Sequence, residues 1–167
     1  MVTTAELEKA RTIAASVPDP ELPFLTLEDL GILREVVLEE DMVVAKLTPT
    51  YIGCPAVSVI EQDVLRALND AGISARILRV ESPAWSTSWI TEQGLSKLKD
   101  NGISPPESKA KNMAISSSIE LFVHRTVACP RCASTQTEKL SEFGSTPCKA
   151  QYRCKACLEP FDHFKCH

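Results

Sequence analysis

The spacing of apolar residues along the chain predicts three helices. The first follows Thr3 and Glu6, which have the spacing of a capping box, and it should end before Pro18. A second helix is predicted over residues 55–72, where apolar side chains recur every three or four positions and share one face. A third is predicted over residues 91–102. The apolar face of the second helix comprises Val57, Ile60, Val64 and Leu68.

A second pattern, rich in β-branched residues, predicts strands. Residues 32–48 contain two such runs on either side of the acidic stretch 39–41, which is typical of a hairpin. Residues 74–80 predict a further strand. A helix that joins two strands of one sheet favours a right-handed crossover, so this strand should lie parallel to the hairpin. We therefore expect an α+β domain over residues 1–104, with a small mixed sheet and packed helices.

The composition changes after this domain. Residues 105–120 are polar and rich in serine and lysine, and they predict a linker. Residues 121–167 contain six of the seven cysteines and few large apolar side chains. A segment of this kind needs a metal in place of a core, so we expect a C-terminal zinc ribbon.

Two CxxC pairs carry the metal-site prediction. Cys129 and Cys132 form one pair, Cys154 and Cys157 form the other, and 154 − 132 − 1 = 21 residues separate them. Two such turns supply four thiolates for a tetrahedral zinc site that has no open coordination position. The site should therefore be structural, with QTEKL, QYR and FDHFK as the short strands around it.

Several alternatives remain open for these cysteines. A tetrahedral sulfur site also accepts iron, and Cys148 with the second pair has a spacing near that of a ferredoxin cluster. Cys148 and Cys166 are possible additional ligands or simple packing residues. The odd number of cysteines excludes complete internal disulfide pairing, and reduced thiols are the rule in the cytoplasm, where we expect the protein.

Cys54 is the only cysteine of the first domain and lies just before the strongest helical pattern. We predict that it is the N-cap of this helix, where backbone N–H groups and the helix dipole would lower the pKa of its thiol. The alternative is a buried thiol that only packs. Polar candidates for the same site are Asp19 and Glu21 in the PDPE loop, and Thr48 and Thr50 beside the cysteine.

Composition and missing motifs restrict the functional classes. The formal net charge of −4 and pI of about 5.4 argue against binding to a phosphate backbone. We expect neither a secretory signal nor a membrane span, because no basic start and no run of 18 apolar residues occurs. The chain also lacks nucleotide, P-loop and di-iron motifs, and no histidine precedes His124 as a base for Cys54.

The segments DPELP, LEDLGILREV, LTPTYIGCPA and SPAWSTSWIT together resemble the metal–sulfur cluster assembly domain family, over roughly residues 5–104. The tail, with GISPP and CPRC followed by FGSTPCKAQYRCKACLEPFDHFKCH, resembles accessory proteins of the bacterial phenylacetyl-CoA epoxidase system. Those proteins join such a domain to a zinc ribbon, so the resemblance covers nearly the whole chain.

The resemblance implies a non-catalytic assembly factor that supports maturation of iron–sulfur or di-iron centres of the epoxidase in phenylacetate catabolism. It implies that Cys54 is the functional thiol, with Asp19 and Glu21 nearby, and that iron or an iron–sulfur cluster visits it transiently. Partners would be the oxygenase or reductase component, and a homodimer is left open. The alternative interpretation is a zinc-ribbon protein that binds nucleic acid or regulates.

Overall fold

The computed structural model describes residues 3–51, 53–106 and 127–165. The chain forms two compact units, Met1–Gly94 and Leu95–Cys166. The division falls earlier than the predicted boundary at residue 104. Most of the predicted linker, 105–120, lies outside the described residues.

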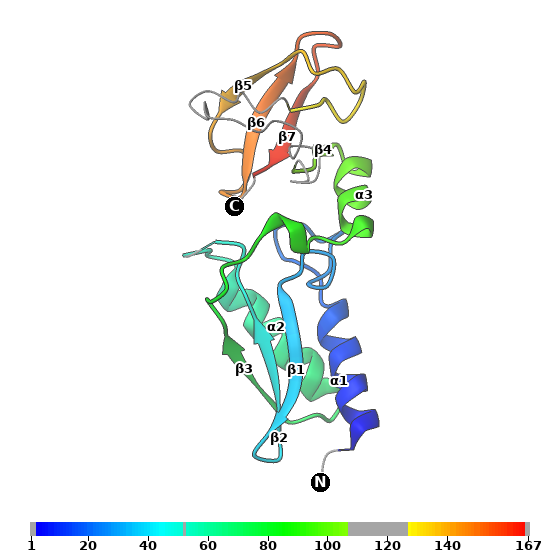
Figure 1. Ribbon diagram of the computed structural model, residues 1–167, viewed down its shortest axis with the longest axis vertical. Coiled ribbons are helices and arrows are strands. Elements are labelled where there is room, and N and C mark those ends of the chain that lie inside the picture. Colours follow the sequence, from blue (N-terminus) through cyan, green and yellow to red (C-terminus); the bar gives the residue numbers. More distant parts are fainter. Residues whose placement is uncertain (1–2, 52, 107–126, 166–167) are drawn as a thin grey trace, which may run out of the picture. The chain divides into compact units, whose positions relative to one another are not determined.

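The N-terminal unit contains the predicted hairpin and crossover strand (Figure 1). Strand β1 pairs antiparallel with β2, and β2 pairs parallel with β3, so the sheet order is β1-β2-β3. The predicted mixed sheet is therefore confirmed. The elements are α1 (Thr4–Ser16), β1 (Leu33–Glu39), β2 (Met42–Leu47), α2 (Val57–Asp70) and β3 (Ala75–Arg79).

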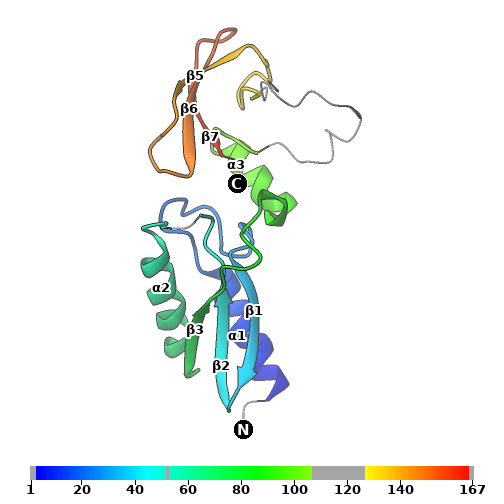
Figure 2. The same cartoon turned by 60° about the vertical axis from the view of Figure 1, so that its left-hand side comes forward.

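Both helices cover one face of this sheet. Helix α1 packs on β1 and β2, α2 packs on β3, and the two helices contact each other (Figure 2). The capping box predicted at Thr3 and Glu6 is present. Val43, Ala45 and Leu47 of β2 share the face that meets the helices and are buried, and Val44 on the opposite face is buried as well.

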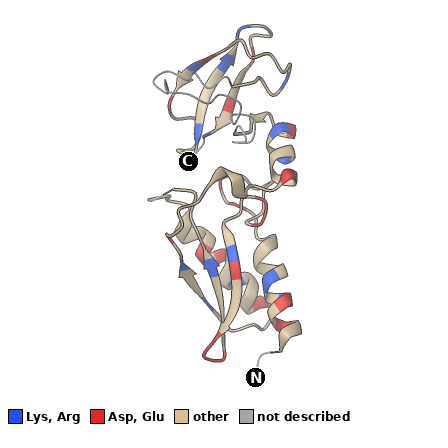
Figure 3. Ribbon diagram, in the orientation of Figure 1, with Lys and Arg blue, Asp and Glu red and all other residues tan. Residues whose placement is uncertain are grey.

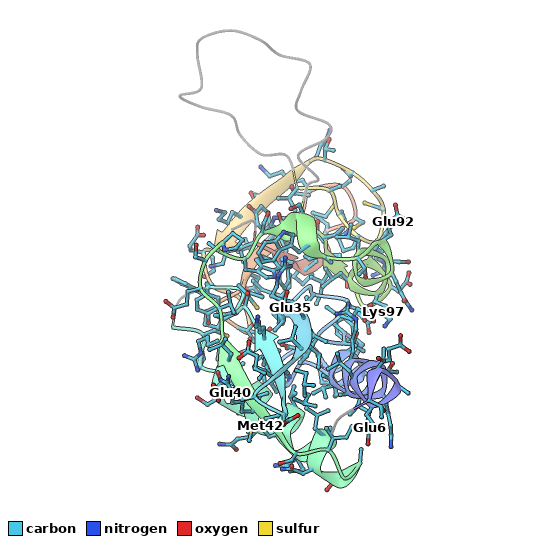
Figure 4. The ribbon with its side chains drawn as sticks, turned by 60° about the horizontal axis from the view of Figure 1, so that its bottom comes forward. Glu6, Glu35, Glu40, Met42, Glu92 and Lys97 are labelled. Carbon is cyan, nitrogen blue, oxygen red and sulfur yellow. The ribbon has the colours of Figure 1, made fainter. Side chains whose placement is uncertain are left out.

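The opposite sheet face carries charge. Lys46 on β2 pairs with Glu35 at 2.8 Å, and Arg76 on β3 pairs with Glu39. Figure 3 shows the charged residues on β1 and β2 and the acidic hairpin turn. Figure 4 labels Glu35 on this face and Met42 next to that turn.

Residues 17–32 form an irregular segment that is fixed by hydrogen bonds. Buried Asp29 accepts a hydrogen bond from the backbone N–H of Thr26 at 3.0 Å, and its own N–H donates to Thr26 Oγ1 at 3.1 Å. The indole of buried Trp85 donates to the Leu30 carbonyl at 2.8 Å. A Cβ added at Gly31, where φ is +65°, would lie 2.6 Å from Trp89, so this position requires glycine.

The C-terminal unit contains a four-stranded sheet in the order β4-β7-β6-β5. The three strands predicted around the cysteines are confirmed as β5 (Thr137–Ser141), β6 (Lys149–Cys154) and β7 (Pro160–Phe164). The sequence did not predict the fourth strand, β4 (Ile103–Ser104), which pairs parallel with β7. The remaining elements are a short 3₁₀ turn, η1 (Thr87–Trp89), and α3 (Glu92–Asp100), where the two units meet along the chain.

Candidate metal centre and thiol site

The structure brings the four CxxC cysteines together. The sulfur atoms of Cys129, Cys132, Cys154 and Cys157 all lie within 4.8 Å of one another. Cys132 Sγ is 3.5 Å from Cys154 Sγ, and Cys129 Sγ is 3.8 Å from Cys157 Sγ. Each of these close pairs joins one turn to the other, as a shared metal requires.

These distances fit one tetrahedral ion. With zinc–sulfur bonds of about 2.3 Å, the edge of a tetrahedron of four sulfurs is about 3.8 Å. Cys129 and Cys154 are buried, whereas Cys132 and Cys157 are exposed, so each turn offers one inner and one outer thiol. The residues present therefore fit a metal site, and a bound zinc would add its binding energy to the small core of this unit.

Backbone amides favour the thiolate form of Cys154, which is the form that binds a cation. The N–H of Cys157 donates to Cys154 Sγ at 3.5 Å. This bond, with a second from Ala156, lowers the pKa of the Cys154 thiol to about 6. The N–H of Ser134 lowers the pKa of Cys132 and is the largest single effect, but the neighbouring cage sulfurs, Cys154 first among them, and burial together outweigh it, and the pKa rises to about 12. Without a metal, this pair of sulfurs therefore shares one proton.

A small apolar cluster supports the cage. It comprises Val127, Cys129, Cys154 and Phe161, and Tyr152 stacks on Phe161 with ring centroids 6.0 Å apart. Two of its four buried members are metal-ligand candidates, so the cage and this core are one structure.

Of the two additional ligands predicted from the sequence, the structure describes only Cys148. Buried Cys148 lies outside the four-cysteine group and has its sulfur 3.0 Å from Thr146 Oγ1. Cys166, like His124 and His167, lies outside the described residues. His163 is buried, and its Nδ1 lies 3.1 Å from the carbonyl of Ser104 on β4.

The second candidate site surrounds Cys54, which ends a turn after β2. Its N–H donates to the Tyr51 carbonyl at 3.4 Å, and its own carbonyl accepts from Val57 at 3.3 Å. The predicted N-cap position is wrong: the N-cap is Ala56, with no side-chain cap, and α2 begins at Val57. Residues 55–56 form a turn that separates Cys54 from the helix.

The predicted direction of the Cys54 pKa is also wrong. Burial raises the pKa of this thiol, and the negative charges of Glu21 and Asp19 raise it further. The N–H of Ala56 and the side chain of Tyr51 act in the opposite direction but are outweighed. The amide N–H of Ala56 therefore lowers the pKa of Cys54 as expected, but burial and the nearby carboxylates raise it by more.

The Pro-rich loop brings its carboxylates toward Cys54. Asp19 is buried, and its Oδ1 accepts hydrogen bonds from the N–H groups of Glu21 and Leu22, each at 2.9 Å. The N–H of Asp19 donates to the Leu25 carbonyl at 2.9 Å, which closes the loop. Asp19 thus shapes the loop, and Glu21 lies near enough to Cys54 to act on its charge.

Three further polar side chains lie in the same stretch as Cys54. Thr48 and Thr50 are buried, and Thr48 Oγ1 has no hydrogen-bond partner among the described residues. The hydroxyl of Tyr51 is buried as well. We did not predict Tyr51 from the sequence, although it is the only aromatic residue in TPTYIGCPAV.

Comparisons with known proteins match both units. The family described as "Iron-sulfur cluster assembly protein" matches residues 8–75, and the "PaaD zinc beta ribbon domain" matches residues 115–165. The crystal structure of a domain of unknown function, DUF59, from Bacillus anthracis has a TM-score of 0.51 and 28% identity, covering 56% of this chain and 92% of that one. A solution structure from Mycobacterium tuberculosis, of a protein associated with [Fe-S] complex assembly and repair, has 31% identity, covers 57% of this chain and 82% of that one, but has a TM-score of only 0.33.

Fold and sites thus define a class: an iron–sulfur cluster assembly domain followed by a zinc β ribbon. A curated Escherichia coli (strain K12) protein, provisionally named as a subunit of 1,2-phenylacetyl-CoA epoxidase, is 39% identical over 99% of this chain and 96% of its own length. The chain belongs to the family of this epoxidase subunit. No helix in the part of the chain that the structure describes has the length and apolar character needed to cross a membrane.

Proposed function

We propose that the protein is a non-catalytic accessory factor that supports maturation of iron–sulfur or di-iron centres of phenylacetyl-CoA epoxidase. The proposal rests on membership of the epoxidase subunit family and on an assembly-family domain within the same chain. The observation that carries it is the separation of two kinds of sulfur site. Four cysteines form a closed cage in one unit, and one thiol, Cys54, belongs to the other.

In this proposal the two sites have different tasks. The ribbon, formed from the C-terminal part of the chain, holds one zinc through Cys129, Cys132, Cys154 and Cys157 and has a structural role, because four thiolates leave no open position. Cys54 contacts the cargo, iron or an iron–sulfur cluster. Asp19, Glu21, Thr48 and Thr50 form its surroundings.

The charges around Cys54 suit transient contact. Burial and the nearby carboxylates favour the protonated thiol over the free thiolate. A cation that approaches Glu21 and Asp19 removes this disadvantage, because positive charge stabilises the thiolate. The site would therefore bind when a metal is delivered and return to a thiol when the metal leaves. Such a reversible thiol site fits a cytoplasmic protein, where cysteines stay reduced.

The experiment is complementation of a gene deletion. Cells that carry Cys54→Ala should fail to grow on phenylacetate, while growth on succinate stays normal. Purified Cys54→Ala should keep its zinc and its melting curve, which separates loss of function from loss of fold. Full growth on phenylacetate with this variant would remove the thiol from the mechanism.

Metal analysis after anaerobic purification gives a second test. Wild-type protein should contain one zinc per chain, and any iron should be absent from Cys54→Ala. Equal iron in the two proteins would locate the iron elsewhere and contradict a cargo role for Cys54.

A further inference from the structure

The acidic side chains of the ribbon are all paired. Among residues 127–165 the four carboxylates each lie within 3.7 Å of a lysine or arginine nitrogen. Two cations of this segment, Arg153 and Lys165, form no salt bridge with a carboxylate among the described residues. The pairs are Glu138–Lys155, Glu142–Lys139, Glu159–Arg131 and Asp162–Lys149.

Leu140 is presented to solvent by a bulge. In the β5–β6 ladder Lys139 pairs with Tyr152 and Ser141 pairs with Gln151, so Leu140 is an extra residue on β5. A bulge of this kind turns a side chain out of the regular sheet. Leu140 is 52% exposed, and β5 is an edge strand, because it pairs with β6 alone among the described strands.

The side chain of Phe143, three positions after Leu140, is exposed and contacts the Lys165 cation. The side-chain nitrogen of Lys165 lies 4.3 Å from the centre of the Phe143 ring and donates to the Glu142 carbonyl at 3.0 Å. The Phe143 side chain is 63% exposed, and the backbone N–H of this residue donates to Ser141 Oγ at 3.2 Å. A large aromatic side chain is thus exposed and restrained together, which lowers the entropy lost on binding.

We propose that Leu140, Phe143 and Lys165, here named the β5 tip, form a docking surface for an acidic protein partner with an apolar pocket. Phe143 would fill the pocket, as buried aromatic anchors do in protein interfaces, and Lys165 would meet the partner's carboxylates. The partner is a protein component of the epoxidase system, the oxygenase or the reductase. This identification rests on the proposed function.

A protein fits this surface better than a nucleic acid. Phosphate-backbone binding draws on many cations, with about 6–10 phosphate contacts in strong cases. Here four of the six cations in residues 127–165 already pair with carboxylates. The exposed side chains of the β5 tip are mainly apolar, and these favour a partner that can bury them.

The test measures binding of the full-length, zinc-loaded chain to each purified epoxidase component by biolayer interferometry. Phe143→Ala and Leu140→Ala should each weaken binding to one component by about 10-fold or more, the usual effect of truncating an anchor. Lys165→Met should chiefly slow association at low salt. Met42→Ala, which truncates another exposed apolar residue on the hairpin of the other unit, is the control and should bind like wild type.

Each other outcome overturns the inference. If Phe143→Ala and Leu140→Ala bind with wild-type affinity, the β5 tip is not part of the interface. If the wild-type chain binds none of the epoxidase components, these proteins are not its partners. Salt-sensitive binding of a DNA duplex of about 20 base pairs that these variants abolish would assign the surface to nucleic acid. Growth of Cys54→Ala cells is read separately, because loss of the thiol role leaves partner binding unchanged.

Discussion

Loss of one buried thiolate from the metal cage should destabilise the ribbon more than loss of an exposed one. Cys154→Ser and Cys132→Ser each remove one ligand of the four, but Cys154 is fully buried and Cys132 is exposed. Structural zinc contributes about 10–16 kcal/mol to such sites, so one thiolate accounts for roughly 2.5–4 kcal/mol. Both variants should therefore bind zinc two to three orders of magnitude more weakly.

Cys154→Ser carries a further cost. The serine hydroxyl would replace a sulfur that accepts a hydrogen bond from the Cys157 N–H and packs in the apolar cluster. Burial of a hydroxyl with imperfect hydrogen bonds costs about 1–3 kcal/mol, which the exposed position avoids. The ribbon of Cys154→Ser should thus unfold at lower temperature than that of Cys132→Ser, also in excess zinc.

The assay is competition with a chromophoric zinc chelator, combined with melting curves of the full-length chain. The transition of the N-terminal unit should be the same in both variants and in wild type, because its core contains none of these cysteines. The reasoning fails if Cys154→Ser keeps one zinc per chain with affinity within about threefold of wild type.

The remaining predictions concern the N-terminal unit. The rate of Cys54 alkylation by iodoacetamide, followed by peptide mass spectrometry, should rise with pH only above the range of an ordinary cysteine. Tyr51→Phe should shift this pH profile to higher pH and Glu21→Gln should shift it to lower pH. Identical profiles for the three proteins would contradict these roles. Since the folded pKa is raised, this thiol's contribution to stability is complete below its unfolded pKa and is lost as pH rises through the folded value, as pH-dependent urea melts would report. Gly31→Ala should lower the free energy of unfolding by more than about 2 kcal/mol, whereas Gly72→Ala, also at positive φ but with nothing within 4 Å, should cost about 1 kcal/mol; equal urea midpoints would refute the Trp89 contact as the cause. Trp85→Phe should cost about 1 kcal/mol in the same assay through the lost bond to the Leu30 carbonyl, and an unchanged midpoint would rule that bond out as a contributor.

Features that depend on neighbours in the chain followed from the sequence. The capping box at Thr3 and Glu6, the hairpin turn at residues 39–41 and the two CxxC turns involve groups only a few residues apart. Local geometry determines such contacts, so residue type and spacing are sufficient. The crossover onto β2 also followed, because handedness and helix length leave one economical arrangement.

Only the tertiary structure determined how burial and distant charges shift the pKa of Cys54 and which strands pair. The sequence placed Cys54 beside a helix and predicted a lowered pKa, but the fold buries the thiol and brings in Glu21 and Asp19 from a loop more than 30 residues away. It also pairs Ile103–Ser104 with β7 and turns Leu140 outward by a bulge that depends on its partner strand. Desolvation, long-range charge and strand register depend on which surfaces meet in three dimensions, and the spacing of residues along the chain does not contain that information.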